Sequence, residues 1–459
     1  MKVLFCASEV TPFAKTGGLA DVAGSLPVAL GELGVDVAVM MPRYRGIRYH
    51  KKKMARRVEA YFVDHESYFN RSSLYGNEKG DYPDNLKRFS FFCHQALFLA
   101  KQIGFRPDIV HAHDWQTALL SVILKTKSAD DPFFQKTKSL LTIHNLAYQG
   151  VFPYSRFSDT EMDPSLFSVE GFEFYGKVNL LKAGILFADA ISTVSTGYAR
   201  EILTKEYGCA LEGVLALRKN RLSGILNGID TKEWDPKRDG ALASTYSSKT
   251  LLEKRANKSW LQNHFKLAPS LEKPLLAMVS RLVDQKGLDI LLGALDALAA
   301  KEVQFILLGE GEKQYHSAFL QMAKRHPHSV GVHLGFDSQL AHKVYAGADF
   351  IMMPSIFEPC GLGQMIGLRY GTIPIVRRTG GLADTVVDAA HPSARGNGFV
   401  FTEPTSPELY KCVERAAKFY ANKKSFRDLQ ANAMKQDFSW QKSAQDYVNL
   451  YKKIMGNFE

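Results

Sequence analysis

Apolar runs of strand length recur along this chain with helical patterns between them, and the series starts again after a polar stretch at residues 229–249. Strands buried on both faces have such runs, and strands that alternate with helices form doubly wound parallel sheets. The sequence therefore predicts the α/β class, with two doubly wound, Rossmann-like domains joined near residues 235–245. The expected strands lie at residues 2–8, 36–42, 108–113, 139–145, 190–195 and 222–228, and then at 274–280, 303–309, 331–336, 350–355 and 372–377.

An amphipathic segment ends the chain. It begins at Ser439, a typical N-cap residue, and its apolar side chains share one helical stripe. A stripe this apolar must pack against another surface, and we expect that surface on the first domain; simple closure of the second domain is the alternative. The expected domains are residues 1–235 with 441–459, and residues 236–440. The stripe consists of Trp440, Ala444, Tyr447, Val448, Tyr451, Ile454 and Met455.

The composition is typical of a soluble protein from a reducing compartment. Of the 459 residues, 46% are hydrophobic, which is enough for full cores. No run reaches the roughly 20 apolar residues of a membrane span, and the N-terminus lacks a signal-peptide pattern. The five cysteines include no CxxC pair, which argues against zinc. We expect a cytoplasmic protein without a metal, another cofactor or a membrane partner.

The net charge of +11 raises the question of an anionic partner. A solvated basic surface is the simpler interpretation. Nucleic acid is disfavoured, because the sequence has neither a zinc finger nor an aromatic and basic RNA-binding signature. The densest basic stretch, residues 43–57, indicates a charged loop and helix face.

The hexapeptide TGGLAD occurs twice, at residues 16–21 and 379–384, each time directly after a basic residue. Ligands of doubly wound sheets bind beyond the carboxyl ends of the strands, so each copy is expected near a cleft between the domains. In the first copy, Gly17 and Gly18 would let backbone amides approach a phosphate at a helix N-terminus, and Lys15 adds a positive charge. A tight turn that needs positive φ is the alternative.

Charged residues also follow strands of the second half. Arg281 and Lys286 follow its first strand, where a pyrophosphate is expected, although a surface ion pair is the alternative. Glu358 follows the run at 350–353, and residues 359–364 offer free amides behind it. This carboxylate either binds sugar hydroxyls or caps a helix. The glycines of the second TGGLAD copy are expected mainly to form a tight turn.

Histidines end two strands of the first half, in HAHDW at 111–115 and in IHN at 143–145. Two histidines and an aspartate suggest a metal site. However, alternate residues of a strand point to opposite faces, and no further ligand set is apparent. The sequence also lacks a DxD triplet. A nucleotide-sugar ligand would therefore need basic side chains and backbone amides, and not a bound divalent ion, to stabilise its leaving diphosphate. Lys15, Arg281 and Lys286 would suit that role.

Together these motifs resemble those of the bacterial glycogen synthases and plant starch synthases, over essentially the whole chain. The resemblance implies the two-domain GT-B fold, with the domains facing across a cleft. It also implies transfer of glucose, with retention at the anomeric carbon, from a nucleotide-activated donor, usually ADP-glucose, to an α-1,4-glucan acceptor. A same-face displacement and a covalent glucosyl intermediate are both open. In order, the motifs are KTGGLADV, HAHDWQTAL, TIHNLAYQGVFP, VSTGYAREI, NGIDTKEWDP, SRLVDQKGLD, FEPCGLGQ, RRTGGLADTV and FSW.

The resemblance also assigns roles to individual residues. Arg281 and Lys286 are implied at the leaving phosphate, His144 beside the anomeric carbon and Glu358 at the glucose hydroxyls. The implied donor-binding residues are Lys15, Gly17, Gly18, Asp21, Phe336, Cys360, Gly361, Leu362 and Gly363. The implied sugar or acceptor side consists of Tyr82, Asp114, Asn145 and Asn227.

Three positions depart from the family pattern. Gly363 stands where the family most often has threonine or an apolar residue, so a hydroxyl contact to phosphate is missing. Phe336 replaces a frequent tyrosine, which keeps stacking on a base but not a hydroxyl contact. Ile366 stands where the broader fold has a second acidic residue, so the ribose must be recognised by other groups.

Two other functions stay open at this point. One is a related GT-B transferase that uses UDP-glucose or a small acceptor, such as a sucrose- or trehalose-forming enzyme. The other is a non-catalytic α-glucan-binding relative, which would be expected to lose Arg281, Lys286 or Glu358; all three are present. A plastid enzyme without its transit peptide would have the same sequence features as a bacterial one, so the plastid stroma is an alternative location.

Overall fold

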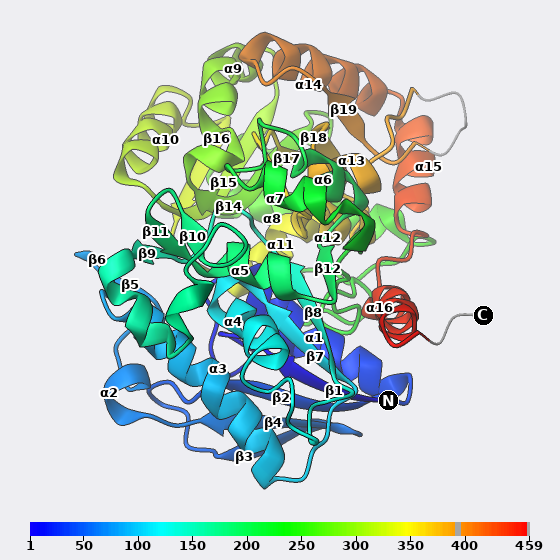
Figure 1. Cartoon of the computed structure of the whole chain (residues 1–459). Coiled ribbons are helices and arrows are strands. Elements are labelled where there is room, and N and C mark those ends of the chain that lie inside the picture. Colours follow the sequence, from blue (N-terminus) through cyan, green and yellow to red (C-terminus); the bar gives the residue numbers. More distant parts are fainter. Residues whose placement is uncertain (391–395, 457–459) are drawn as a thin grey trace. The chain divides into compact units, whose positions relative to one another are not determined.

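The computed structural model describes residues 1–390 and 396–456. By its internal contacts the chain divides into two compact units (Figure 1). Unit 1 consists of Met1–Gly228 with Trp440–Glu459, and unit 2 is Ile229–Ser439. The sequence placed this boundary at 235/236. Residues 229–235 belong to unit 2 because the Ile229 amide donates a hydrogen bond to the Phe438 carbonyl at 2.8 Å, and the Arg369 side chain donates one to the Trp234 carbonyl at 3.3 Å.

Unit 1 contains an eight-stranded sheet with the order β13-β12-β8-β7-β1-β2-β4-β3. All neighbours are parallel except β3 and β4. The chain leaves β1 for β2 on one side and returns to β7 on the other, so the sheet has a topological switch point at β1, where such sheets bind ligands. The strands are β1 (Lys2–Cys6), β2 (Asp36–Pro42), β3 (Lys51–Ala55), β4 (Val58–Val63), β7 (Ile109–His113), β8 (Lys138–Ile143), β12 (Ala190–Thr193) and β13 (Leu222–Gly224).

Helices and short hairpins complete unit 1. The α-helices are α1 (Gly18–Glu32), α2 (Glu66–Phe69), α3 (Asn85–Gln102), α4 (Asp114–Lys125), α5 (Leu180–Phe187), α6 (Thr196–Glu201), α7 (Glu212–Leu217) and α16 (Trp440–Ile454). The 3-10 turns are η1 (Tyr154–Thr160), η2 (Pro164–Leu166) and η3 (Lys219–Arg221). The minor strands are β5 (Gly76–Asn77) with β6 (Gly80–Asp81), and β9 (Val151–Pro153) with β10 (Glu173–Phe174) and β11 (Lys177–Asn179).

The C-terminal helix α16 packs on α1, as the sequence predicts, and Figure 1 shows this red helix with the elements of unit 1. Its Tyr447 and Tyr451 are fully buried, and the Ser443 hydroxyl donates a 2.6 Å hydrogen bond to the Leu226 carbonyl. The apolar stripe of residues 440–455 therefore covers part of the first unit's core.

The basic stretch at 43–57 does not form the expected helix face. It contains the edge strand β3, whose Lys51, Lys52 and Lys53 are exposed. Lysines on an edge strand keep its unpaired backbone groups from pairing with another chain. They also leave β3 without the apolar run that indicates a strand in a sequence. Its partner β4 has the alternating burial of a half-buried strand.

Unit 2 contains a six-stranded parallel sheet with the order β16-β15-β14-β17-β18-β19. Numbered within the unit, this is the 3-2-1-4-5-6 order of a nucleotide-binding doubly wound sheet, with its switch point between β14 and β17. The strands are β14 (Leu275–Leu282), β15 (Gln304–Gly311), β16 (Val330–Leu334), β17 (Phe350–Met353), β18 (Ile373–Arg377) and β19 (Phe399–Phe401). The helices are α8 (Lys254–His264), α9 (Leu288–Ala300), α10 (Lys313–Arg325), α11 (Ser338–Gly347), α12 (Gly363–Arg369), α13 (Gly380–Thr385), α14 (Ser406–Ala421) and α15 (Lys423–Ala433), with 3-10 turns η4 (Leu251–Glu253) and η5 (Asp284–Lys286).

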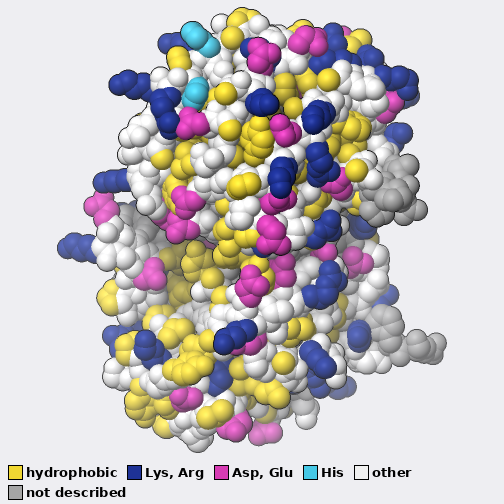
Figure 2. All heavy atoms as spheres, turned by 90° about the horizontal axis from the view of Figure 1, so that it is seen from above, with side chains coloured by type: hydrophobic (Ala, Val, Ile, Leu, Met, Phe, Trp, Pro, Cys, Tyr) yellow, Lys and Arg dark blue, Asp and Glu magenta, His cyan; other side chains and the backbone are white. Residues whose placement is uncertain are grey.

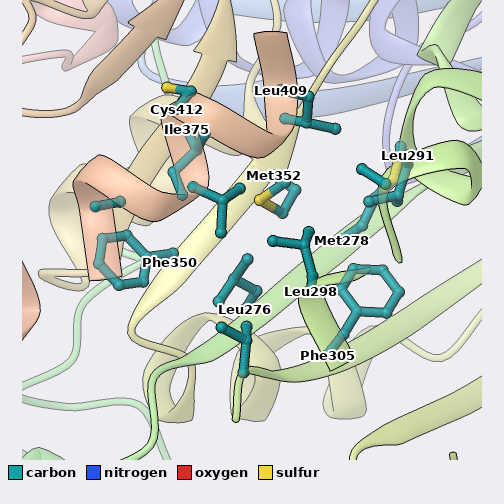
Figure 3. Packing of buried hydrophobic residues seen from close by; sticks show 14 of the residues in the cluster. Leu276, Met278, Leu291, Leu298, Phe305, Phe350, Met352, Ile375, Leu409 and Cys412 are labelled. Atoms are coloured by element: carbon teal, nitrogen blue, oxygen red, sulfur yellow. The ribbon is translucent and has the colours of Figure 1, made fainter. Parts of the chain in front are cut away.

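The core of unit 2 lies between this sheet and the helices α9 and α14 (Figure 3). Leu276 and Met278, two residues apart on β14, point to the same face, as do Phe350 and Met352 on β17. All four are at most 2% exposed. The predicted α/β class with two doubly wound parallel sheets is therefore confirmed.

The surface in Figure 2 shows Lys and Arg side chains spread among acidic and hydrophobic ones, without one dominant basic patch on that face. Within residues 1–390 and 396–456, no helix combines the length and the apolar character that crossing a bilayer requires.

Candidate functional site

One buried carboxylate organises the loop after β1 in unit 1. Glu9 is 4% exposed. Its Oε2 accepts hydrogen bonds from the backbone amides of Thr16, at 2.5 Å, and Gly17, at 3.2 Å, while its Oε1 accepts one from the Tyr75 hydroxyl at 3.0 Å. Glu9 and Tyr75 were not predicted from the sequence, because a contact between residues 66 positions apart leaves no local pattern in it. The Gly17 amide, expected at a phosphate, is already bound to Glu9.

The two glycines of the first TGGLAD copy are required neither by the backbone nor by close packing. Gly17, the residue before α1, has an extended φ of −153°, and Gly18 is not among the glycines with positive φ. A β-carbon on either residue would meet no atom of the chain within 4 Å. The alternative of a positive-φ turn is therefore wrong for this copy, and both glycines border open space. Lys15, in the same loop, has its Nζ 2.6 Å from Oδ1 of Asp21.

Two histidine rings meet at the ends of β7 and β8. Nδ1 of His113 lies 2.9 Å from Nε2 of His144. Burial lowers the pKa of His144 to about 3 and holds the pKa of His113 well below its usual value. Both rings are therefore neutral at physiological pH. Among the described residues, no group of three or more His, Cys, Asp and Glu side chains has the arrangement of a metal site.

Asp114, the first residue of α4, fixes the backbone of His144. Its Oδ1 accepts a hydrogen bond from the His144 amide at 2.7 Å, and it adopts a left-handed φ of 55°. Burial raises the pKa of Asp114 to about 7, against the opposing effect of the His144 and Asn145 amides. The Asn145 side chain in turn accepts a hydrogen bond from the Ala147 amide at 3.0 Å, which shapes the following turn. The structure thus brings Asp114, His144 and Asn145 together.

The remaining two predicted residues of unit 1 have different surroundings. Asn227 is 6% exposed, and its Oδ1 has no hydrogen-bond partner in the described part of the chain. A buried amide oxygen without a partner is costly unless a ligand or water binds it. Tyr82 is partly buried, and the guanidinium carbons of Arg71 and Arg88 lie 4.7 Å and 5.1 Å from the centre of its ring. Its amide donates a 2.9 Å hydrogen bond to the Tyr75 carbonyl, which connects it to the loop held by Glu9.

In unit 2, Lys286 and Glu358 form an ion pair at the switch point. Nζ of Lys286 lies 2.7 Å from Oε2 of Glu358, and these side chains are 15% and 7% exposed. The Ser355 hydroxyl donates a 3.0 Å hydrogen bond to the same Oε2. Gly287 permits this approach, because it has a φ of +67° and a β-carbon there would lie 2.0 Å from the Pro354 carbonyl oxygen. The surface ion pair considered from sequence is in fact a nearly buried pair.

Arg281 and Phe336 do not join this pair. Arg281, near the end of β14, is exposed, and none of the described residues forms an ion pair or hydrogen bond with its side chain. Phe336, between β16 and α11, is 82% exposed. Arg378, before the second TGGLAD copy, is also exposed and has no ion-pair partner among the described residues. These side chains remain accessible to a ligand.

The loop from Cys360 to Gly363 is held from behind by Gln364. The Gln364 amide nitrogen donates hydrogen bonds to the carbonyls of Cys360 and Gly361, both at 3.0 Å, and Gly361 has a left-handed φ of 72°. Leu362 directly precedes α12, whose first residue is Gly363. A β-carbon on Gly363 would lie 3.1 Å from the Tyr345 hydroxyl. The Tyr345 hydroxyl therefore occupies the space that a side chain at residue 363 would need.

The second TGGLAD copy supports this loop. Gly380 has a φ of +42°, and the Gly381 amide donates a 3.0 Å hydrogen bond to the Glu358 carbonyl. A β-carbon on Gly381 would lie 2.1 Å from the Cys360 carbonyl oxygen. Close approach to the loop therefore requires glycine in this copy, in contrast to the first one.

Both halves of the chain match models of glycosyltransferase families. Residues 2–217 match the starch synthase catalytic domain, and residues 261–436 match the glycosyl transferases group 1. A glycogen synthase from Geotalea daltonii is 46% identical over 479 aligned residues, which cover 99% of each chain.

Two solved structures share the fold. The catalytic domain of starch synthase IV from Arabidopsis thaliana, bound to ADP and acarbose, superimposes with a TM-score of 0.91 at 32% identity, covering 99% of each chain. Sucrose-phosphate synthase from Thermosynechococcus elongatus superimposes with a TM-score of 0.67 at 16% identity, covering 100% of each chain, a likeness of fold alone.

Proposed function

This chain belongs to the glycogen synthase and starch synthase family of glucosyltransferases, which have the GT-B fold, and we propose that it transfers glucose from ADP-glucose to the non-reducing end of an α-1,4-glucan with retention at the anomeric carbon. ADP and acarbose, an oligosaccharide, are bound in the related starch synthase IV. They support an adenosine diphosphate donor and a glucan acceptor here. The similarity to a bacterial glycogen synthase likewise supports the prediction of a cytoplasmic location.

The nearly buried pair of Lys286 and Glu358 is the observation that carries the proposal most directly. It lies at the switch point of a sheet with nucleotide-binding strand order. Cleavage of the glucosyl–phosphate bond builds negative charge on the diphosphate and positive charge on the sugar. A fixed ammonium stabilises the first, and a fixed carboxylate binds the glucose hydroxyls and stabilises the second. The exposed guanidinium of Arg281 adds a second cation, which can bind two phosphate oxygens at once.

The remaining donor contacts follow from the loops. The amides of residues 360–363, held by Gln364, bind phosphate oxygens, and exposed Phe336 stacks on the base. In unit 1, the Gly18 amide and the Lys15 ammonium bind the diphosphate. The Gly17 amide does not, because it is bound to Glu9. Gly17 contributes the open space next to the loop. Asp21, which pairs with Lys15, lies toward the nucleotide.

The sugar side is formed by His144, Asn145, Asp114, Asn227 and Tyr82. The unpaired Oδ1 of Asn227 accepts a hydrogen bond from a sugar hydroxyl. Asp114 is poorly suited as a nucleophile, since a pKa of about 7 leaves a large part of its carboxyl group protonated near neutral pH and its Oδ1 accepts the His144 amide. A same-face displacement therefore fits best: the bond from C1 to the phosphate oxygen breaks, the acceptor oxygen bonds to C1, and the acceptor proton moves to the departing phosphate.

The test is an initial-rate assay with glycogen and either ADP-glucose or UDP-glucose, measuring release of the nucleoside diphosphate. We expect a higher kcat/KM with ADP-glucose and a product that α-amylase digests, which reports α-1,4 linkages. A higher kcat/KM with UDP-glucose would overturn the donor assignment. Glycogen binding without release from either donor would instead identify a non-catalytic glucan-binding protein.

A further inference from the structure

The hydrogen bond between His113 and His144 has only one proton to share. Nδ1 of His113 and Nε2 of His144 are 2.9 Å apart, and both rings are neutral. One ring must donate and the other accept. The position of that proton decides whether the other nitrogen of His144, its Nδ1, carries a hydrogen or a lone pair.

The surroundings of His113 decide the direction. Its Nε2 is buried and has no hydrogen-bond partner among the described residues. If His144 donated, His113 would carry its proton on Nε2, as a buried N–H without an acceptor. If His113 donates from Nδ1, only a lone pair is left without a partner. Buried N–H groups without acceptors are rarer in proteins than unpaired acceptors.

The His113 ring cannot turn to find another partner. Its backbone is tied to Thr117, which accepts from the His113 amide at 2.5 Å and donates to the His113 carbonyl at 2.8 Å. Its ring lies between Phe5 and His111, with centroid distances of 4.2 Å and 4.1 Å.

His111 is itself fixed through both ring nitrogens. Nδ1 hydrogen-bonds with the Tyr451 hydroxyl of α16 at 2.8 Å, and Nε2 with the Thr142 hydroxyl at 2.6 Å. Neither nitrogen is left to pair with the free Nε2 of His113. The ring that faces His144 is thus held by three strands and the C-terminal helix.

We propose that His113 is a positioning residue that donates its Nδ1 proton to His144 and thereby fixes His144 as the tautomer protonated on Nδ1. The Asp114 carboxylate accepts a hydrogen bond from the His144 amide and so holds the His144 backbone. The adjacent residues His113 and Asp114 thus fix the tautomer and the position of His144, respectively. In that tautomer the His144 ring offers an N–H donor to an oxygen of the sugar and no base. This last consequence rests on the proposed function, in which His144 contacts the sugar.

The direct test is the protonation of the His144 ring nitrogens, read from 15N chemical shifts of the whole protein labelled at histidine. The His144→Asn variant assigns the signals. We expect a protonated Nδ1 and an unprotonated Nε2 in the wild type near pH 7. A protonated Nε2 would overturn the proposal, whatever the activity of any variant.

Three substitutions of His113 with similar size separate donation from packing. In His113→Asn the amide nitrogen stands near the former Nδ1 and still donates. In His113→Asp the carboxylate only accepts, so His144 must protonate Nε2, and His113→Leu does neither. We expect His144 to keep the Nδ1 proton in the Asn variant and to lose it in the Asp variant. If the tautomer of His144 is the same in both, His113 does not control it and the proposal is wrong.

Rates then test the link to function separately. With ADP-glucose and glycogen, kcat should fall about tenfold more in the Asp variant than in the Asn variant, roughly the effect of one hydrogen bond. A switched tautomer without this difference would support the positioning role of His113 and contradict the proposed contact between His144 and the sugar.

Discussion

The α-carbon of Gly381 faces the carbonyl oxygen of Cys360 so closely that a β-carbon on Gly381 would lie only 2.1 Å from it. Gly18, at the equivalent position of the first TGGLAD copy, has no atom within 4 Å of the place its β-carbon would take. The two identical hexapeptides therefore need glycine for different reasons. In unit 2 the glycine lets two loops touch, and in unit 1 it keeps the surface of the loop empty.

Alanine at each position should separate these reasons. Gly381→Ala should lower the free energy of unfolding by about 1–3 kcal/mol, the usual cost of forcing atoms into a packed site. Gly18→Ala should leave stability unchanged or slightly higher, because Gly18 begins helix α1 and alanine favours a helix, but should raise the KM for ADP-glucose. Denaturation midpoints and initial rates of both variants provide the comparison. Equal stability losses would show that the repeat has one structural role.

The fold could be predicted from the sequence because burial leaves a local pattern. The strand runs and the stripe that places α16 on unit 1 both come from apolar periodicity. The edge strand β3 was missed because its three successive lysines leave it without such a pattern. Contacts between distant residues leave no such trace. The bond from Tyr75 to Glu9 spans 66 positions, and neither residue has an unusual neighbour in the sequence.

The candidate site was predictable in part. Lys286 and Glu358 lie 72 positions apart, but each follows a strand of the same parallel sheet, so strand ends already place them at one edge. The partner of Gly363 was not predictable, because Tyr345 reaches it from the last turn of another helix, α11. Helix periodicity predicts which face of a helix a residue lies on, but it does not predict which atoms of another element that residue contacts.

The ion pair of Lys286 and Glu358 gives the second prediction. Lys286→Met alone leaves a nearly buried carboxylate without its cation, which typically costs about 3–5 kcal/mol of stability. The double variant Lys286→Met/Glu358→Gln removes both charges and keeps a group that can bond Ser355, so it should recover most of that loss. Turnover should stay at least ~10²–10³ below wild type in both, as when a charge-stabilising donor is removed. Thermal melts and kcat are the measurements, and recovery of kcat in the double variant would remove the pair from the mechanism.

The third prediction concerns the departure at Gly363. Threonine here would press against the Tyr345 hydroxyl, 3.1 Å from the position of the new β-carbon. We expect Gly363→Thr to lower the free energy of unfolding by about 1–3 kcal/mol. Removing that hydroxyl in Gly363→Thr/Tyr345→Phe should recover most of it.

Donor binding should follow the same pattern. Only in the double variant should the new threonine hydroxyl tighten binding of ADP, by about 0.5–1.5 kcal/mol for one hydrogen bond. Calorimetric titration of ADP into the wild type, both single variants and the double variant measures this. Tighter binding in Gly363→Thr alone would show that the Tyr345 side chain moves aside at no cost in free energy.

Asp114 gives a prediction of pH dependence. Its pKa rises from an ordinary value of 3.8 to about 7 on folding, mainly through burial. Between these values the unfolded chain has released the proton and the folded chain still holds it. The contribution of Asp114 to stability is therefore full below about pH 4, falls as the pH rises toward 7, and stays constant above 7. The slope is at most about 1.4 kcal/mol per pH unit, and the partial exposure of Asp114 narrows the pH range over which it applies.

Asp114→Asn removes this titration while keeping an oxygen that accepts the His144 amide. Relative to wild type, the variant should therefore gain stability as the pH rises from about 4 to 7, with no further change from 7 to 8. Urea denaturation of both proteins at pH 5, 6, 7 and 8 measures the difference directly, since all other titrating groups are shared. A difference that is constant across pH 5–7 would mean that Asp114 is already ionised in the folded protein. It would then be available as a nucleophile, and the argument for a same-face displacement would lose its support from this residue.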